Sequence, residues 1–291
     1  MTVKTKLKRN IYIITDRNAH GAFLTQSDRR RILTRCMADL AEGGYKLSHT
    51  EGFKQKHIRY LNKFWLSKQL NPSTIKNRNA YLRWLCQQLG KPEMMPTNDE
   101  LGVPKRKYLT NENKAVDLPV STSNKINERL EILLNLERHF GLRRKEVLMI
   151  QPRVADQGDF IKLKGSWCKN GRPRNVPIHT AEARYWLNQS KLLAPNRTSS
   201  LIGEGKTFKS AKNLYDKQVQ RAGIKNPHGL RHKFAQERYK ILTGWEATAN
   251  GGPTKRELSA SQLKIDAEAR MSISEELGHS RVAITNTYLG R

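Results

Sequence analysis

A loss of hydrophobic periodicity in residues 92–119 constrains the fold of this 291-residue chain more than any other feature. This stretch gathers Pro, Gly and Asn residues together with three adjacent cations at 105–107. Such a composition is typical of a linker, although a surface loop would share it. Since the chain is long enough for two modest cores, we predict an N-terminal domain in residues 1–104, a basic linker in 105–119 and a second domain in 120–291.

The first 104 residues show helical periodicity in the segments 27–42, 54–70 and 72–89. Asn71-Pro72 supplies a cap and a first-turn proline for the third segment. We therefore predict a small helical bundle, with Tyr81 and Trp84 packed in its core rather than free to stack on bases. Cations are expected on its outer faces, namely Lys63, Lys68, Lys76, Arg78 and Arg83.

The second domain is predicted to be mainly α-helical with a small antiparallel β-sheet. Two β-like runs, 160–163 and 175–178, are joined across a segment that contains Asn170-Gly171, a strong hairpin-turn signal. The helical segments around them are 121–139, a short one ending at Ile150, 180–190, 207–222, 228–242 and 256–277.

Charge indicates the kind of partner. The formal net charge is +28, and it divides almost evenly: 23 basic against 10 acidic side chains in residues 1–119, and 31 against 16 in residues 120–291. Both halves are therefore expected to bind a polyanion, most simply a nucleic acid. Charge does not separate DNA from RNA, and a basic ribosome-associated protein would have a similar balance.

The three cysteines, Cys36, Cys86 and Cys168, are odd in number and widely spaced. They form neither a Cys-x-x-Cys pair nor a zinc pattern, so we predict reduced thiols in a cytoplasmic, nucleoid-associated protein. The apolar run at residues 11–14 is far too short for a signal peptide, and no stretch reaches the length of a transmembrane helix. A membrane partner is not expected.

Six residues on separate predicted elements supply the groups needed to attack a phosphodiester with a tyrosine. A phenol has a pKa of about 10 and needs nearby positive charge or a base before it becomes a nucleophile. Guanidinium groups match the oxygens of the phosphorane-like transition state, and an ammonium can protonate the leaving alkoxide. No metal or nucleotide cofactor is required. The six residues are Arg143, Lys169, His228, Arg231, His279 and Tyr288.

Two of the local patterns are weak by themselves, and the pattern at residues 228–232 is more specific. Arg143 and Glu146 lie three apart at a helix start and could be a surface ion pair, and a turn lysine such as Lys169 usually faces solvent. His228 and Arg231 share the face of an opening helical turn. A metal pair from His228 and His232 would need a glutamate at position 229, where the chain has glycine, so His232 is expected to be a core histidine.

Taken in order, these patterns resemble the tyrosine recombinase (phage integrase) family. They are Gly-Leu-Arg-x-x-Glu at 141–146, Lys-x-x-Arg-x-Arg-x-Val-Pro-Ile at 169–178, His-x-Leu-Arg-His at 228–232, Leu-Gly-His-Ser at 277–280, and Tyr288 nine positions after His279. The resemblance implies a helical core-binding domain that grips DNA, followed by a tyrosine recombinase catalytic domain.

The resemblance also implies a role for each position. Arg143 and Arg231 would hold the scissile phosphate, and Tyr288 would attack it to leave a 3′-phosphotyrosine and a free 5′-hydroxyl. Lys169 would be the general acid. His228 would accept or share the tyrosine proton, His279 would hydrogen-bond a non-bridging oxygen, and Glu146 would orient its neighbours. These roles need no cofactor.

Two departures from the family pattern concern the end of the chain. Arg231 and His279 are 48 positions apart, so residues 243–265 are interpreted as an insertion. Only three residues follow Tyr288 in the sequence, so we expect protomers either to associate through other surfaces or to be weakly oligomeric without DNA.

The sequence thus predicts a site-specific DNA recombinase, the integrase of a bacterial mobile element. Its partners would be double-stranded DNA recombination sites, further protomers in a synaptic tetramer, and DNA-bending accessory proteins. The alternatives are a catalytically silent DNA-binding protein of the same fold and a basic RNA-binding protein.

Overall fold

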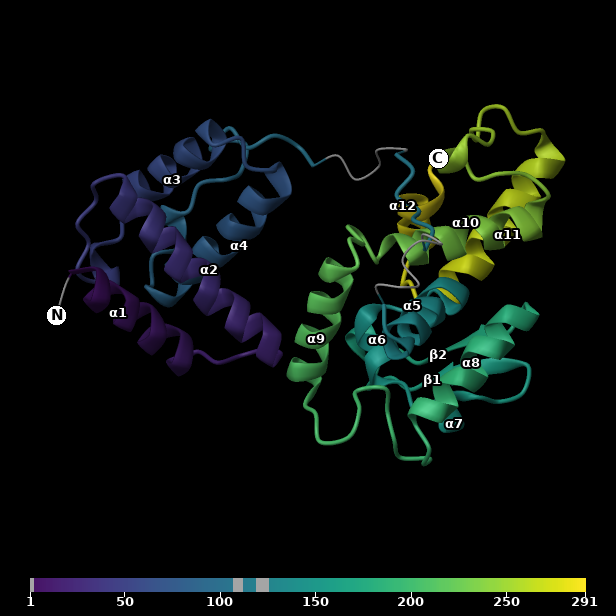
Figure 1. Ribbon diagram of the computed structural model, residues 1–291. Coiled ribbons are helices and arrows are strands. Elements are labelled where there is room, and N and C mark those ends of the chain that lie inside the picture. Colours follow the sequence, from purple (N-terminus) through teal and green to yellow (C-terminus); the bar gives the residue numbers. More distant parts are fainter. Residues whose placement is uncertain (1–2, 107–111, 119–125) are drawn as a thin grey trace. The chain divides into compact units, whose positions relative to one another are not determined.

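The structure is a computed structural model that describes residues 3–106, 112–118 and 126–291 (Figure 1). The chain divides into two compact units, Met1–Lys107 and Tyr108–Arg291. Both are mainly helical, and the second contains a two-stranded antiparallel sheet. The predicted fold class is therefore confirmed. No helix in the described part of the chain is long and apolar enough to cross a membrane.

The first unit is a helical bundle. Asn71 caps its last α-helix, because its side chain accepts a hydrogen bond from the Ser73 amide at 2.8 Å, as the sequence predicted. The three predicted helices are present, although the first begins four residues earlier than expected. The elements are α1 (Val3–Arg17), α2 (Phe23–Glu42), η1 (Thr50–Gly52), α3 (Gln55–Ser67), α4 (Pro72–Gln88) and η2 (Pro92–Met94).

Helix α1 is an element that the sequence analysis missed. It places Leu7, Ile11 and Thr15 on one buried face, and α1 packs against α2. The sequence analysis compared the apolar run at residues 11–14 only with the length of a signal peptide. Its helical signal is the i, i+4 spacing of those three residues, which extends beyond the run on both sides.

Helices α2, α3 and α4 bury the apolar faces that periodicity predicted, including Leu33, Trp65 and Leu82. Trp84 packs as expected, partly buried beneath the Arg29 guanidinium at 4.1 Å from its ring centroid. The prediction that Arg78 faces outward is wrong. Its side chain is only 18% exposed and pairs with Asp39 at 3.0 Å, because that buried carboxylate needs a cationic partner.

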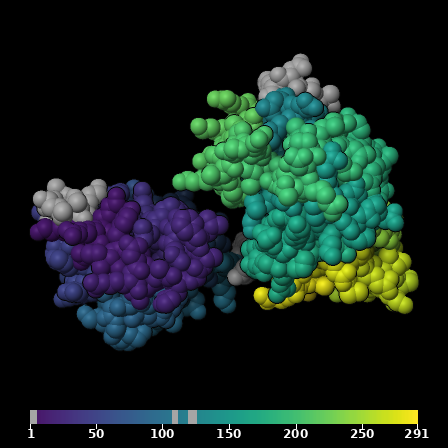
Figure 2. Space-filling view, turned by 90° about the horizontal axis from the view of Figure 1, so that it is seen from below, coloured from purple at the N-terminus to yellow at the C-terminus, as the bar shows by residue number. Residues whose placement is uncertain are grey.

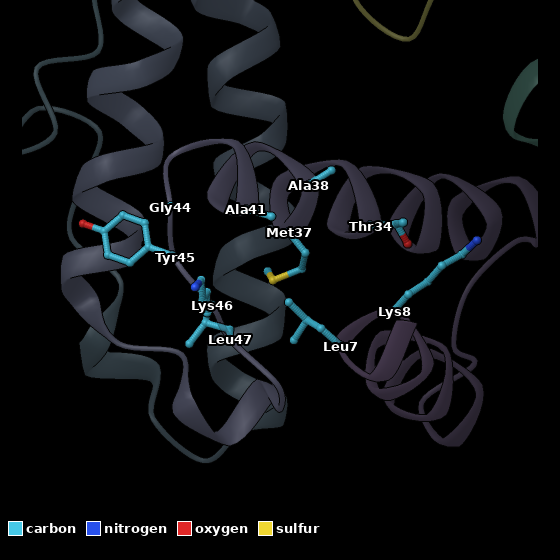
Figure 3. Close-up of a pocket in the computed structure, with 10 residues that line it drawn as sticks. All are labelled: Leu7, Lys8, Thr34, Met37, Ala38, Ala41, Gly44, Tyr45, Lys46 and Leu47. Atoms are coloured by element: carbon cyan, nitrogen blue, oxygen red, sulfur yellow. The ribbon is translucent and has the colours of Figure 1, made fainter. Parts of the chain in front are cut away.

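An apolar groove of about 250 Å³ runs between α1, α2 and residues 44–47 (Figure 3). Leu7 and Met37 lie in it, and Lys8 and Lys46 line it as well. In Figure 2, α1 and α2 form the purple face of this unit. The core of the first unit therefore reaches the surface along this groove.

The second unit encloses a separate apolar core to which nearly all its helices contribute. Its elements are α5 (Glu128–Phe140), α6 (Arg144–Met149), α7 (Pro152–Ala155), β1 (Phe160–Leu163), η4 (Lys169–Gly171), β2 (Arg174–Pro177), α8 (Ala181–Leu193), α9 (Phe208–Arg221), α10 (Gly229–Thr243), η5 (Thr248–Asn250), α11 (Ala260–Glu276), η6 (Val282–Thr285) and α12 (Asn286–Leu289).

Strands β1 and β2 pair antiparallel, with Phe160 opposite Pro177 and Leu163 opposite Arg174. The predicted hairpin is thus present, and its second strand begins one residue earlier than expected. The ten-residue connection turns at Asn170, which adopts a left-handed backbone conformation with φ +60°. That conformation is the one for which an Asn-Gly pair is favoured.

Two helix starts differ from the prediction. Of the helix expected over 121–139, residues 121–125 lie outside the described residues, and α5 begins at Glu128 after the Asn127 cap. Helix α11 begins at Ala260 rather than 256, because Ser259 and Gln262 form a capping box there. The predicted insertion thus falls on the end of α10, a connection at residues 244–259 that contains η5, and the start of α11.

We predict that Asn79→Ala destabilises the first unit by about 1–3 kcal/mol, because it removes the donor to the buried Asn62 Oδ1. Asn62 and Asn79 are fully buried and exchange two hydrogen bonds, at 3.1 and 2.8 Å. Calorimetric unfolding of the full chain measures the loss. Gln87→Ala, at an exposed amide on the same helix, is the control, and equal effects of the two variants would contradict the assignment.

Candidate active site

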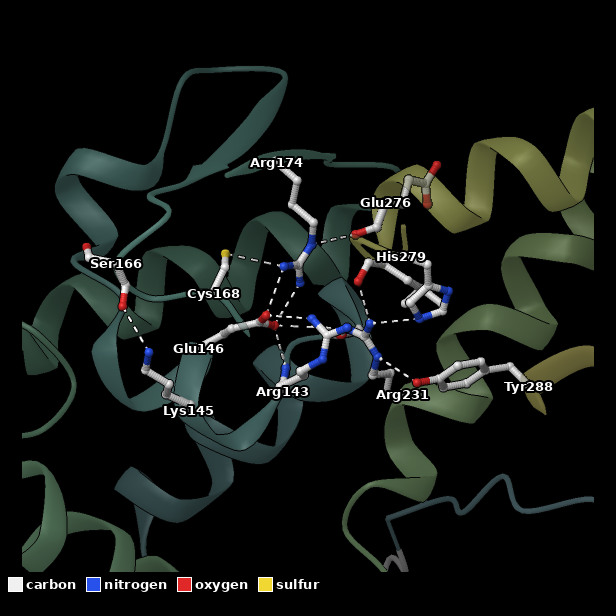
Figure 4. Close-up of polar contacts among 12 residues, drawn as sticks. Arg143, Lys145, Glu146, Ser166, Cys168, Arg174, Arg231, Glu276, His279 and Tyr288 are labelled. Carbon is white, nitrogen blue, oxygen red and sulfur yellow. Dashed lines mark hydrogen bonds and ion pairs between the residues drawn. The ribbon is translucent and has the colours of Figure 1, made fainter. Parts of the chain in front are cut away.

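The candidate site is organised around Glu146, a carboxylate with no exposed surface in the first turn of α6. The Arg143 backbone amide donates to its Oε2 at 2.7 Å, and Arg143 Nη1 donates to Oε1 at 2.8 Å (Figure 4). Glu146 thereby accepts the backbone amide of the residue before the helix, which is one half of a capping box. From sequence, Arg143 and Glu146 could have been an ion pair on the surface. The structure places the Glu146 carboxylate of this pair inside the protein.

Arg174 on β2 holds the other side of the same carboxylate. Its Nη1 and Nη2 donate to Oε1 and Oε2 of Glu146 at 2.9 and 2.7 Å, a bidentate arrangement, and its Nε donates to the Glu276 carbonyl at 2.8 Å. The sequence analysis assigned Arg174 no role. The pattern that could have revealed it is the alternation of buried and exposed positions along a strand, because Arg174 lies on the same buried face of β2 as Val176.

Arg231 on α10 is fully buried and joins three distant parts of the unit. Its guanidinium donates to the carbonyls of Gly141 and Leu277, and its Nη1 lies 4.0 Å from Glu146 Oε2. Gly141 permits this approach: its φ is +57°, and a Cβ there would lie 2.6 Å from the Phe234 ring. Three guanidinium groups thus surround one carboxylate.

Electrostatics keep Glu146 ionised. Burial by itself would raise its pKa, but the hydrogen bonds and charges of Arg174, Arg143 and Arg231 outweigh burial and lower the pKa to about 2. Burial lowers the pKa of Arg231 to about 10, which still leaves it protonated at neutral pH. One negative charge therefore faces three positive charges, and the cluster retains an excess that an anion can neutralise.

Tyr288 lies at the edge of this cluster, 7% exposed. Its hydroxyl accepts a hydrogen bond from Arg231 Nε at 3.3 Å (Figure 4). The His279 ring stacks on the phenol ring with centroids 5.2 Å apart, and the rings of His232 and His228 lie at 4.4 and 6.1 Å. The nucleophile candidate is thus flanked by one guanidinium and three imidazoles.

The three imidazoles are held neutral. Burial, reinforced by the charges of Arg231 and Arg143, lowers the pKa of His279 to about 3. Burial also lowers the pKa of His232, to about 4, and that of His228. His232 is buried as predicted, but its Nδ1 has no hydrogen-bond partner among the described residues, so it is not a satisfied core histidine.

Lys169 is placed apart from the cluster. It is exposed at the start of η4, and no hydrogen bond or ion pair joins it to the other five candidates in the described parts of the chain. Lys145 is exposed, and its Nζ donates to the Ser166 carbonyl at 3.0 Å in the same connection between β1 and β2. The structure therefore brings together Arg143, Arg231, His279 and Tyr288, with His228 beside them and Lys169 outside.

This arrangement can bind an anionic oxygen between guanidinium groups and present a phenol to it. Within residues 3–106, 112–118 and 126–291, no three His, Cys, Asp or Glu side chains are grouped so as to hold a metal ion. The guanidinium groups and the phenol match the oxygens of a phosphate diester.

Comparison with known families decides the identity of the fold. Residues 4–95 match the family model for the N-terminal domain of phage integrases, and residues 108–237 match the integrase model. The chain belongs to the tyrosine recombinase family. It is an enzyme of the class that cleaves DNA and transfers the strands, a site-specific recombinase. No curated protein sequence matches it significantly.

Solved tyrosine recombinases share the fold of this one. A lambda integrase dimer bound to a COC′ core site aligns with a TM-score of 0.60 at 14% identity, covering 100% of this chain and 97% of that one. The Tn1549 transposon integrase with transposon right end DNA gives 0.57 at 14%, covering 100% and 95%. XerH recombinase in a post-cleavage complex with palindromic difH substrate gives 0.55 at 15%, covering 93% and 77%.

For this recombinase we predict that Arg174→Met destabilises the second unit by about 3–5 kcal/mol, since it removes the bidentate partner of a buried carboxylate. Calorimetric unfolding measures the change. Arg172→Met removes an exposed arginine two positions away and should have little effect. A stability loss no larger than that of the control would show that Arg174 does not support Glu146.

We also predict that acid destabilises the protein through His232. Because its folded pKa of about 4 lies below the unfolded value of about 6.5, the stability it contributes is complete above pH 6.5 and is lost as pH falls toward 4. His232→Leu should therefore show a smaller decrease in Tm between pH 7 and pH 5 than the wild type. His20→Leu, at an exposed position, should keep the wild-type slope, and an unchanged slope in His232→Leu would refute the assignment.

Proposed function

We propose that Tyr288 is the nucleophile of this recombinase and that Arg143 and Arg231 bind the scissile phosphate. The observation that carries the proposal is the hydrogen bond from Arg231 Nε to the Tyr288 hydroxyl, within a cluster that retains positive charge. The guanidinium beside the phenol oxygen can also hydrogen-bond a phosphate that this oxygen attacks. The product would be a 3′-phosphotyrosine and a 5′-hydroxyl.

His228 is proposed to accept or share the tyrosine proton. Its lowered pKa makes it neutral at physiological pH, and a neutral imidazole has a nitrogen free to act as a base. No hydrogen bond joins the two side chains among the described residues, and their ring centroids are 6.1 Å apart. The proton would therefore move after Tyr288 shifts toward the phosphate, or through a water molecule.

His279 is proposed to bind a non-bridging phosphate oxygen. In the DNA-free protein its Nε2 lies 3.4 Å from Arg231 Nη2 and its Nδ1 lies 3.3 Å from Thr285 Oγ1. Because a guanidinium can only donate, Nε2 is the acceptor in this state. A phosphate bound at this site would accept the hydrogen bond from the Arg231 guanidinium in place of His279. The tautomer with the proton on Nε2 would then be favoured, and His279 could donate to the phosphate.

Lys169 is proposed as the general acid that protonates the leaving 5′-oxygen. Its exposed position on the connection between β1 and β2 lets its long side chain move toward bound DNA. Glu146 is proposed to have a supporting role, since its carboxylate is occupied by Arg143 and Arg174 and has no exposed surface. It orients the arginines and does not react.

We further propose that the substrates are double-stranded DNA recombination sites and that the protein serves as the integrase of a bacterial mobile element. The charge of +28 and the match to the integrase model support this assignment. Pairing two sites would require four protomers on the DNA. DNA-bending accessory proteins would assist that assembly.

We predict that nicked DNA carrying the target site traps a covalent adduct with the protein, and that Tyr288→Phe abolishes the adduct while leaving DNA affinity unchanged. Gel analysis of the adduct measures the effect. Tyr185→Phe, at an exposed tyrosine on α8, should be trapped like the wild type. If the wild type binds the site but is never trapped, the protein is a catalytically silent DNA-binding member of the fold.

Arg143→Ala should slow adduct formation by on the order of 10² or more, by analogy with removal of a single oxyanion donor. The rate with nicked DNA at saturating protein measures it. Arg144→Ala removes the neighbouring arginine, which pairs with Asp216 instead of Glu146, and should leave the rate within about twofold of the wild type. Near-normal cleavage by Arg143→Ala would remove that residue from the site.

A further inference from the structure

The backbone around Tyr288 is fastened at two points behind the active site. Gln236 Nε2 donates to the Tyr288 carbonyl at 3.2 Å, and Arg270 Nη1 donates to the Gly290 carbonyl at 3.0 Å. Arg270 Nη1 also donates to the Asn286 side chain at 2.9 Å. Helix α12 has only four residues, which is too short to be stable by itself. The position of Tyr288 therefore depends on contacts from other elements.

Arg270 is itself held by a chain of buried hydrogen bonds. Asp266, 4% exposed, accepts from Arg270 Nε at 2.7 Å and from the Tyr239 hydroxyl at 2.6 Å. The Tyr239 hydroxyl in turn accepts from Trp245 Nε1 at 3.2 Å. Trp245 belongs to the connection at residues 244–259, and α10, α11 and α12 lie side by side at this end of the unit (Figure 1). The chain of contacts thus leads from that connection to α12.

The connection also contacts the segment after Tyr288 directly. Gly290 packs so closely on η5 that an added Cβ would lie 2.7 Å from the Ala249 amide nitrogen. At the end of η5, the side chain of Asn250 accepts from Asn113, which itself accepts from Gln236 at 2.9 Å. Backbone packing and side-chain hydrogen bonds therefore both connect η5 to the segment that contains Tyr288.

We propose that Arg270 and the connection at residues 244–259 form a seat for α12 that positions Tyr288 against Arg231. This inference rests on the proposed role of Tyr288 and gives a function to the segment interpreted as an insertion. Arg270 is a positioning residue: it binds the Asn286 side chain before the tyrosine and the Gly290 carbonyl after it, and it touches no reacting atom. Because a displacement of about 1 Å can reduce a rate on the order of 10²-fold, loosening the seat should slow cleavage without weakening DNA binding.

The first test uses Arg270→Met. We expect amide hydrogen exchange in residues 282–291 to accelerate on the order of tenfold while exchange in α5 stays unchanged, because only the seat opens. Adduct formation with nicked DNA should slow roughly 10- to 100-fold at unchanged affinity. Arg270→Lys, which can still donate to the Gly290 carbonyl, should recover part of both effects. Arg138→Met is the matched control, since Arg138 pairs with Glu237 away from α12.

The second test compares two glycines with positive φ, Gly290 at +75° and Gly251 at +85°. An added Cβ meets η5 at Gly290 but nothing within 4 Å at Gly251. Gly290 also has a ψ of −173°, a backbone region that only glycine adopts readily, whereas Gly251 has a ψ of 5° in the left-handed helical region. Gly290→Ala, which adds both the clash and the larger strain, should therefore accelerate exchange in residues 282–291 and slow cleavage, whereas Gly251→Ala should do neither. Equal behaviour of the two variants would overturn the packing part of the proposal.

The outcomes separate this inference from the proposed function. If the wild type is trapped and Arg270→Met matches it in exchange and rate, the seat is wrong and the role of Tyr288 stands. Faster exchange throughout the unit, α5 included, would show a general structural role for Arg270 and also overturn the proposal. If residues 282–291 loosen selectively but the wild type is never trapped, the seat exists and the catalytic role of Tyr288 fails.

Discussion

The second unit depends on one electrostatic constraint, the burial of the Glu146 carboxylate. A carboxylate without exposed surface is costly unless charged partners compensate its lost hydration. Arg143, Arg174 and Arg231 do so from α6, β2 and α10, which are far apart in the sequence. One carboxylate does not neutralise three guanidinium groups, so the interaction that stabilises the fold also leaves a positively charged site. A phosphate would complete that balance of charge.

The proposed site has a rigid part and an adjustable part. Arg174 and Arg231 are buried and each donates to a backbone carbonyl as well as approaching Glu146, so their positions are determined by the fold. Lys169 is exposed, and Tyr288 sits on a four-residue helix that other elements hold in place. This division suits the roles proposed for these residues, because Arg231 would need to stay fixed on the phosphate while the proposed nucleophile and acid approach and leave.

Sequence reasoning reached the fold class and much of the site, but only through signals that act locally or recur in order along the chain. Helical periodicity located α2 to α4, and the ordered motifs pointed to Arg143, Arg231, His279 and Tyr288, which the structure brings together. Arg174 was missed because a charged residue in a strand is normally expected to face solvent. Only the register of β1 and β2 shows that its side of the strand is buried. Residues 244–259 have no periodicity, and contacts such as that of Asn250 with Asn113 join positions too distant for any local pattern to reveal.

The most direct measurement is a crystal structure of the Tyr288→Phe variant bound to DNA that carries its target site. The account predicts that the scissile phosphate lies within hydrogen-bonding distance of Arg143, Arg231 and His279. The aromatic ring at position 288 should stand in line with the bond to the leaving 5′-oxygen, and the Lys169 ammonium should have moved to that oxygen. A phosphate bound elsewhere, with no anion within hydrogen-bonding distance of Arg231, would contradict the central claim.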